Sequence, residues 1–564
     1  METHRDLDVD ASSNAHSTFG GLCGHLEPHW DLEDEQRKKH EVICNKDEGS
    51  VHNPGVLAFS LTKRSAPKLS AWLPERAHFW RAEGHAIAWR NLLVSQINLT
   101  LGFAVWLMWS ILAVRIQQIH DHDPTQFTFG LDSLSTGGET HDETLRVKYN
   151  AMLYLLPALA GLAGGAFRLT NSFMVLSTGG RVAIVSTTLM LILPCGLASV
   201  ELQKPDPDLL TLAAAAMLSG MGGGAFASSM SNISTFFPAR IDGFPLGLNA
   251  GLGNMGVSLS QVLIPLVTGG YICASTECDY INMADVAHLR EQLHRGALLW
   301  TPFCIIAAVA GYLWLSDMPQ QGNAPLRWRM YYYFCLQASA CGAAVVAGIV
   351  LFSSENFFSV SPQRQIGKVF LLVCTVCVLA HVFLWFASPQ AIQQQIRSQM
   401  IIFRNRHTYL MVWLYMVCFG TYIGFSSALP KLMLDVFGYV GEGDAVRVNP
   451  NAPQVSIYSF LGPFLGSLVR PMGGWLSDKF GAAIVTQAYV GVLCGSALGL
   501  SLVIRKARES QQPEEYFSAF LSLFLLLFTA SGIANGSTFK QMSQVFRVWV
   551  CGWVCGWYVI YVYI

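Results

Sequence analysis

The sequence predicts an all-α membrane protein built from two related helical halves. Hydrophobic residues make up 52% of the chain and charged residues only 13%, and the mean hydropathy is positive. That much apolar surface exceeds what one or two soluble cores bury, so the long apolar stretches are expected to cross a bilayer. A short pattern, Gly-x-x-x-Arg, occurs twice, at Gly164 to Arg168 and at Gly466 to Arg470. We interpret the two copies as equivalent positions of an internal repeat.

Net charge and cysteine content narrow the function classes. A net charge of -1 argues against a general binder of nucleic acid or anionic surfaces, so any attraction for an anion must come from local placement. The 14 cysteines are scattered, mostly inside apolar stretches, where cysteine acts as a small apolar residue. Cys273 and Cys278 share a loop, and the sequence leaves open whether they form a disulfide.

The first 65 residues are polar and lack the apolar core of a signal peptide, which predicts a disordered cytoplasmic N-terminal tail. Its spacing of cysteine and histidine matches no closed zinc pattern, so no metal is expected there. The residues concerned are Cys23, His25, His29, His40 and Cys44. Residues 66–91 are expected to form an amphipathic lead-in to the first span.

Apolar stretches of roughly 20 residues follow, the length at which a helix crosses a bilayer. The N-terminal six-helix half is expected at 92–316, a linker at 317–407 and the C-terminal half, core helices 7–10, at 408–547. Two inserted spans, at 331–352 and 366–387, are expected to form a peripheral hairpin beside the bundle. The core spans are predicted at 92–116, 149–175, 180–200, 209–235, 244–270, 296–316, 408–433, 455–476, 482–504 and 514–537.

Lys and Arg in the short loops fall on one side of the membrane if the first span begins inside. This predicts a cytoplasmic N-terminus, and we expect the protein to lie in the plasma membrane. The exception is the basic cluster of Arg505, Lys506 and Arg508, which falls outside.

The two repeated arginines are the strongest candidate site. A charge at the centre of a span costs roughly 3 kcal/mol even on lenient insertion scales, and such residues are usually functional. Neither span holds an Asp or Glu to pair with Arg168 or Arg470. Two guanidiniums in one dry cavity repel each other unless an anion lies between them. The alternative is an arginine that extends to the interface or pairs with a local carboxylate.

A glycine-rich stretch from Gly220 to Gly256 covers helices 4 and 5. Small residues at intervals of three and four allow tight helix crossings. Four glycines of helix 5 are expected to serve helix packing and gating: Gly247, Gly251, Gly253 and Gly256.

Three asparagines lie in the same two spans. The amide of Asn254 can donate to an anion without adding charge, and a structural hydrogen bond between helices is the equally open alternative. For Asn232 and Asn249 the structural role is favoured.

Three runs carry a resemblance to a known family. They are Phe167-Arg-Leu-Thr-Asn-Ser-Phe-Met-Val175, Ala225-Phe-Ala-Ser-Ser-Met-Ser-Asn-Ile-Ser234 and Gly462-Pro-Phe-Leu-Gly-Ser-Leu-Val-Arg-Pro-Met-Gly-Gly-Trp-Leu-Ser-Asp478. Together with the glycines of helix 5, they resemble the NarK-type nitrate/nitrite porters of the major facilitator superfamily. The match begins at Leu73 and continues to Phe539, omitting the insertion.

The resemblance implies a bundle of two six-helix halves with an anion bound between Arg168 and Arg470. It implies that Phe226, Asn254, Tyr415 and Phe419 line the pocket, and that a cytoplasmic loop motif contains Gly474, Asp478 and Lys479. Nitrate suits such a site because it is flat and weakly hydrated, so guanidiniums meet its oxygens while aromatic faces exclude water.

The expected mechanism is alternating access. Exchange of nitrate for nitrite is favoured over proton symport, because helices 2, 4, 5, 7 and 8 carry no Asp or Glu at depth. His381, in the insertion, is more readily a structural histidine than a proton carrier. We expect a monomer in the lipid bilayer, with nitrate and nitrite as partners, no nucleic acid, no cofactor, no metal and no enzymatic activity.

The sequence departs from the family pattern after Arg547. Residues 548–564 form a low-complexity run of Val, Trp, Cys, Gly, Tyr and Ile where core helices 11 and 12 are expected. Their loss would leave one side of the second half open to lipid. A nitrate-sensing receptor, proton-coupled nitrate uptake and an inactive truncated product therefore remain alternatives to exchange.

Overall fold

The computed structural model divides the chain into two units, residues 1–63 and 64–564. Described residues all belong to the second unit, at 68–129, 139–238, 241–269, 283–319, 321–353, 404–441 and 447–545, with short pieces between 375 and 397. Within these ranges, ten helices are long and apolar enough to cross a membrane. The N-terminal tail, the pair Cys273 and Cys278, most of the second inserted span and the tail 548–564 lie outside the described residues.

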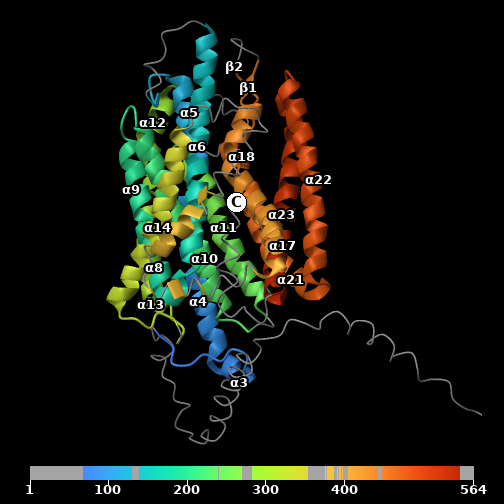
Figure 1. Ribbon diagram of the computed structural model, residues 1–564. Coiled ribbons are helices and arrows are strands. Elements are labelled where there is room, and N and C mark those ends of the chain that lie inside the picture. Colours follow the sequence, from blue (N-terminus) through green and yellow to red (C-terminus); the bar gives the residue numbers. More distant parts are fainter. Residues whose placement is uncertain are drawn as a thin grey trace, which may run out of the picture. The chain divides into compact units, whose positions relative to one another are not determined.

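The N-terminal half contains the six predicted spans, several of them built from two helical segments (Figure 1). A short lead-in, α3 (Ala77–Phe79) and η2 (Trp80–Gly84), runs directly into the first span. The spans are α4 (His85–Leu107) with α5 (Trp109–His122), α6 (Glu139–Asn171), α8 (Gly180–Met190) with α9 (Ile192–Glu201), α10 (Leu209–Ser234), α11 (Gly243–Val267), and α12 (Met283–Leu298) with α13 (Trp300–Trp314). The short α7 (Met174–Thr178) follows α6.

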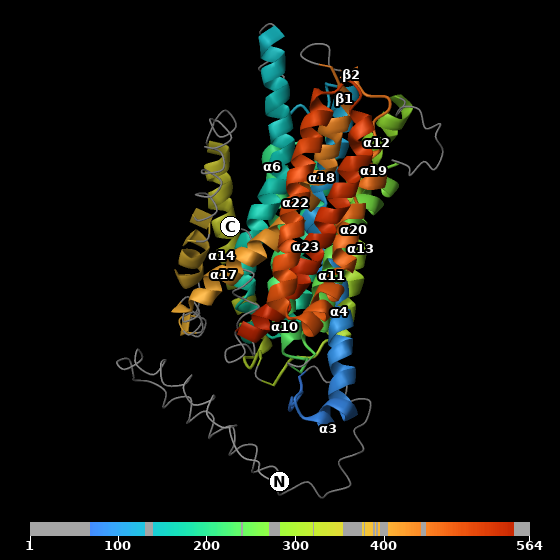
Figure 2. The same cartoon turned by 90° about the vertical axis from the view of Figure 1, so that its right-hand side faces the viewer.

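The first inserted span is α14 (Leu326–Ser353), which packs against α6, α7 and α10 of the N-terminal half. It therefore packs on the first half, while most of its predicted hairpin partner lies outside the described residues. Figure 2 shows α14 beside α6, away from α22 and α23.

The C-terminal half begins with helix 7, made of α17 (Arg406–Tyr415), a π-helical turn η5 (Met416–Gly420) and α18 (Thr421–Phe437). Strands β1 (Tyr439–Val440) and β2 (Arg447–Val448) follow as a small antiparallel hairpin. The remaining elements are α19 (Val455–Tyr458), α20 (Leu461–Leu468), α21 (Arg470–Phe480), α22 (Ala482–Glu509), η7 (Pro513–Tyr516) and α23 (Phe517–Val545).

Helix 8 differs from its prediction as one continuous span. It is broken into α19, α20 and α21, and the last break falls at Val469, directly before Arg470. Pro471 stands at the start of α21, where its missing N–H costs nothing, whereas it could not continue α20. The break makes Arg470 the first residue of a new helix.

The internal repeat is visible in the backbone. Gly179 directly precedes α8 with φ 83°, and Gly481 directly precedes α22 with φ 87°, a left-handed conformation that favours glycine. The same number of residues separates Gly179 from Gly481 as separates Arg168 from Arg470. Equivalent turns therefore follow the two arginine-bearing helices.

Contact between the halves is made mainly by α11, which packs against α20, α21 and α23. On the other end, α18 of the second half packs against α5 and α6 of the first. Gln261 of α11 also donates its amide to the carbonyl of Ser426 in α18 at 2.8 Å. The two halves thus touch on both sides of the level at which the arginines lie.

Candidate functional site

The two arginines come from different halves, and neither side chain reaches the surface. Arg168 stands three residues before the end of α6, and Arg470 begins α21. Both are fully buried. The Nε of Arg168 donates to the carbonyl of Gly223 at 2.9 Å, within its own half. The Nη1 of Arg470 reaches the carbonyl of Ala250 in the other half at 3.5 Å.

Phe419, from the π-helical turn of helix 7, lies against both guanidiniums. Its ring centroid is 4.6 Å from the guanidinium carbon of Arg168 and 5.3 Å from that of Arg470. Both distances lie within the range of a cation–π contact. One ring therefore contacts both cations, and the two buried charges from different halves lie near each other.

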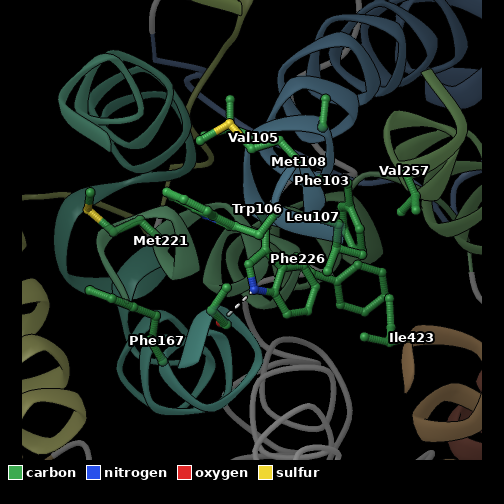
Figure 3. Packing of buried hydrophobic residues seen from close by; sticks show 14 of the residues in the cluster. Phe103, Val105, Trp106, Leu107, Met108, Phe167, Met221, Phe226, Val257 and Ile423 are labelled. Carbon is green, nitrogen blue, oxygen red and sulfur yellow. Dashed lines mark hydrogen bonds between the residues drawn. The ribbon is translucent and has the colours of Figure 1, made fainter. Parts of the chain in front are cut away.

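Further aromatic rings enclose each cation. Phe226 and Trp106 lie 5.0 Å and 5.2 Å from the Arg168 guanidinium carbon, and Figure 3 shows these two residues in the buried hydrophobic cluster. Tyr422 lies 4.3 Å from the guanidinium carbon of Arg470. These rings supply negative faces to the cations in place of water.

The aromatic wall is continuous. Tyr415 stacks on Phe419 at 5.3 Å, and Phe226 stacks on the same ring from the other half at 5.5 Å. The extra residue of a π-helical turn rotates the following side chains, and such turns are frequent at functional sites. The structure therefore brings together four of the predicted residues, Arg168, Arg470, Tyr415 and Phe419, with Phe226 beside them.

Asn254 lies at the edge of the same site. Its Nδ2 donates to the carbonyl of Ala250 at 2.7 Å, the same acceptor that Arg470 reaches. Within the described part of the chain, its Oδ1 has no hydrogen-bond partner, and neither do the Nε and Nη2 of Arg470. Arg470 is therefore a buried cation with two nitrogens, Nε and Nη2, whose N–H groups are available to an acceptor.

The other two asparagines differ from each other. Asn249 donates to the hydroxyl of Ser229 at 3.1 Å, which joins α11 to α10 as predicted. Asn232 is fully buried against the start of α8, and its side-chain amide has no hydrogen-bond partner among the described residues. Among the described residues, the predicted interhelical hydrogen bond of Asn232 is therefore not found.

The glycines of helix 5 sit where α11 approaches other backbones. A Cβ on Gly251 would lie 2.6 Å from the carbonyl oxygen of Ser467, and one on Gly256 would lie 1.9 Å from that of Thr100. A Cβ on Gly253 would meet the side chain of Leu99 at 2.6 Å, while Gly247 leaves an ordinary 3.4 Å to the carbonyl of Arg470. The first two positions therefore require glycine most strictly.

The loop motif joins the halves at the end where α11 begins. Lys540 of α23 lies 3.0 Å from a carboxylate oxygen of Asp478 and 3.5 Å from one of Asp242, which precedes α11. Gly474 lets α21 approach the carbonyl of Gly243. Lys479 points elsewhere, over the ring of Trp475 at 4.0 Å. We call Asp242, Asp478 and Lys540 the inner contact.

A second polar cluster joins the halves at the opposite end. Lys431 of α18 forms an ion pair with Asp435 at 2.6 Å and donates to Asn150 of α6 at 3.1 Å. Tyr154 of α6 donates to the other oxygen of Asp435 at 2.7 Å. We call Asn150, Tyr154, Lys431 and Asp435 the outer contact.

Sequence reasoning did not single out Trp106, Tyr422 and Phe539 as part of the site. Phe539 of α23 contacts Tyr415 at 5.6 Å and Phe226 at 6.1 Å. Aromatic residues in an apolar span usually pack against other helices, so composition gave no signal. Tyr422 stands one helical turn from Phe419, and that spacing could have indicated a shared face. Among the described residues, no group of three or more His, Cys, Asp or Glu is placed to hold a metal ion.

Comparison with known proteins places the fold in a family. A family model described as "Major Facilitator Superfamily" matches residues 97–548. The "Nitrate/nitrite transporter NarU" of Salmonella typhimurium is 30% identical over 482 residues, which cover 85% of this chain and 79% of that protein. The chain belongs to the NarK-type family of the major facilitator superfamily.

Other relatives of this NarK-type chain match over a similar extent. The "Nitrate/nitrite transporter NarU" of Escherichia coli (strain K12) is 29% identical over 87% of the chain and 81% of its own length. The "Probable nitrate/nitrite antiporter NarK2" of Thermus thermophilus is 28% identical, over 85% of this chain and 83% of that protein. A solved structure of the proton:xylose symporter XylE bound to 6-bromo-6-deoxy-D-glucose aligns at 15% identity over 85% of this chain and 86% of that chain, with a TM-score of 0.48.

Proposed function

We propose that this protein transports nitrate and nitrite across a membrane by alternating access. The observation that carries the proposal is the pair of buried arginines, one from each half, that share the ring of Phe419. The relatives named as nitrate/nitrite transporters and antiporters support the choice of substrate.

The site suits a small planar oxyanion. Guanidinium N–H groups bond oxygens in their own plane, and the stacked faces of Tyr415, Phe419 and Phe226 would pack against the flat sides of the anion. The buried N–H groups of Arg470 that lack a partner within the described residues are suitable donors. An anion between Arg168 and Arg470 would relieve their mutual repulsion.

Closure on both sides supports alternating access. The inner contact holds α11 near α21 and α23, and the outer contact holds α18 near α6. With both formed, the arginines are shut off from either surface, the arrangement of an occluded state. Opening requires breaking one contact while the other remains, which is the rocking of two halves about a central site.

Anion binding and closure are coupled in this proposal. Without an anion, the two buried charges repel and oppose closure; with an anion bound, the occluded state becomes accessible. Only a ligand with different affinities for the open and closed states can drive such a change. Because the empty carrier would resist closing, exchange of one anion for another is favoured over net uptake.

Proton-coupled uptake is the second candidate, because a carboxylate does stand between the halves. Asp435 of the outer contact is bonded to Tyr154 and Lys431, and its protonation would weaken both interactions. It lies at the end of α18, away from the aromatic rings around the arginines. This separation favours a structural role over direct coupling to the anion.

The test is transport by the purified full chain in liposomes. Vesicles loaded with nitrite should take up labelled nitrate rapidly, vesicles without internal anion should not, and a pH gradient should change the rate little. Uptake driven by external acid without internal anion would establish proton coupling. Saturable binding without any counterflow would indicate a receptor or an inactive product.

The remaining assignments belong to the same proposal. Transport without chemical change requires no enzyme activity. The Lys and Arg distribution supports a cytoplasmic N-terminus, and we place the protein in the plasma membrane. One chain supplies both arginines, so a monomer is sufficient for the site.

A further inference from the structure

Asn535 of α23 is a buried polar residue that the predicted site does not include. Its side chain is fully buried, and neither Nδ2 nor Oδ1 has a hydrogen-bond partner in the described part of the chain. Nearly all buried polar side chains in proteins are paired, so an amide with both ends unpaired requires an explanation. A bound ligand would supply one.

The helix places Asn535 on the face of α23 that meets helix 7. Four residues earlier, the hydroxyl of Ser531 donates to the carbonyl of Cys418 at 2.6 Å. Four residues later, Phe539 contacts the rings of Tyr415 and Phe226. Since residues at i−4, i and i+4 share one helical face, Asn535 lies opposite the turn that carries Tyr415 and Phe419.

The neighbouring backbone brings the same turn of α23 against Arg470. A Cβ on Gly536 would lie only 2.1 Å from the carbonyl oxygen of Arg470, so the two backbones are in direct contact there. Asn535 is therefore adjacent to the start of α21, on the side of the aromatic wall. It is a neutral donor close to the backbone of Arg470.

We propose that the side-chain amide of Asn535 donates to an oxygen of bound nitrate and sets a preference for nitrate over nitrite. This inference rests on the proposed function. Nitrate has three oxygens and nitrite has two. The guanidiniums of Arg168 and Arg470 approach from the two halves, so together they would donate hydrogen bonds to a larger fraction of the oxygens of nitrite than of nitrate. A third donor from α23 matches the third oxygen. Being neutral, the amide adds selectivity without adding charge to an already cationic site.

The test compares the affinities of the purified full chain for nitrate and for nitrite. N535L keeps the branched shape of the side chain and removes the donor. In it, nitrate should bind roughly tenfold more weakly, the order expected for one hydrogen bond to a charged group, while nitrite affinity changes much less. N535S, whose hydroxyl is a shorter donor, should lie between N535L and the wild type. S531A, one turn away on the same face, is the matched control and should lower both affinities equally or leave both unchanged.

Equal loss of both affinities in N535L would overturn the proposal and assign Asn535 to packing, and so would unchanged affinities. If N535L does not fold, as judged from its melting temperature, the nitrate-to-nitrite ratio of N535S decides in the same way. A wild-type protein that binds neither anion would instead overturn the proposed function, together with this inference.

Discussion

Replacing Gly251 by alanine separates an effect on closure from an effect on folding. Gly251 lies on α11 of the first half, and an added Cβ would stand 2.6 Å from the carbonyl oxygen of Ser467 in the second half. That distance is about 0.8 Å short of ordinary contact, and a backbone carbonyl cannot rotate away. The halves must therefore separate for G251A to be accommodated, so the closed arrangement of the halves forms less readily.

The expected magnitude follows from the cost of overpacking. An extra methyl group in a tightly packed contact costs about 1–3 kcal/mol, which shifts a two-state equilibrium about 5- to 150-fold. The rate of nitrite-for-nitrate counterflow in liposomes should fall by about tenfold or more. The melting temperature should change little, because separation of the halves relieves the strain without disturbing packing inside either half.

Two other glycines of α11 provide the controls. G247A should transport like the wild type, because its Cβ would stand at an ordinary 3.4 Å from the carbonyl of Arg470. G256A should lower the melting temperature, because its Cβ would lie 1.9 Å from the carbonyl of Thr100 inside the first half. Counterflow by G251A at the wild-type rate, or equal slowing of G247A, would refute the reasoning.

Three further predictions concern single side chains. K540Q leaves the carboxylates of Asp242 and Asp478 facing each other without a cation, so the rate of counterflow should fall. Adding D242N to K540Q removes the repulsion and should restore the rate. Failure of D242N to restore counterflow would argue against the inner contact. F419L removes the ring shared by both guanidiniums and should weaken nitrate binding by about tenfold in a titration, whereas unchanged affinity would exclude a role for the ring. D208A removes the N-cap of α10 and should lower the free energy of unfolding by about 1 kcal/mol. The Thr211 hydroxyl and backbone amides hold the Asp208 pKa below its ordinary value. The difference in free energy of unfolding between the wild type and D208A should therefore shrink as the pH falls below the ordinary carboxyl range, and it should persist at higher pH.

The sequence was sufficient to predict most of the membrane helices and to pair the two buried arginines. Long apolar stretches predict membrane helices reliably, and an arginine within one has few roles other than a functional one. Arg168 and Arg470 could therefore be paired from the repeat alone. The family resemblance then added Tyr415 and Phe419, which periodicity could not distinguish from ordinary packing residues.

Other features depend on contacts between distant segments. No local pattern indicates that Lys540 approaches Asp242, because nearly 300 residues separate them. The break at Val469 was missed because the apolar run continues through it, and only Pro471 marked the point. For Asn254 the sequence left open both an anion-binding role and a structural hydrogen bond. In the structure its amide donates to the carbonyl of Ala250, which Arg470 also reaches.

The central claim is that Arg168 and Arg470 bind one anion between the two halves, and nitrate titration of the purified protein tests it most directly. Lysine keeps the positive charge but loses the planar pair of donors, so R168K and R470K should each weaken nitrate binding by about tenfold or more while the fold is retained. In the double variant the loss should be smaller than the product of the single losses, because both side chains act on the same ligand. Nitrate affinity equal to that of the wild type in either single variant would contradict the account.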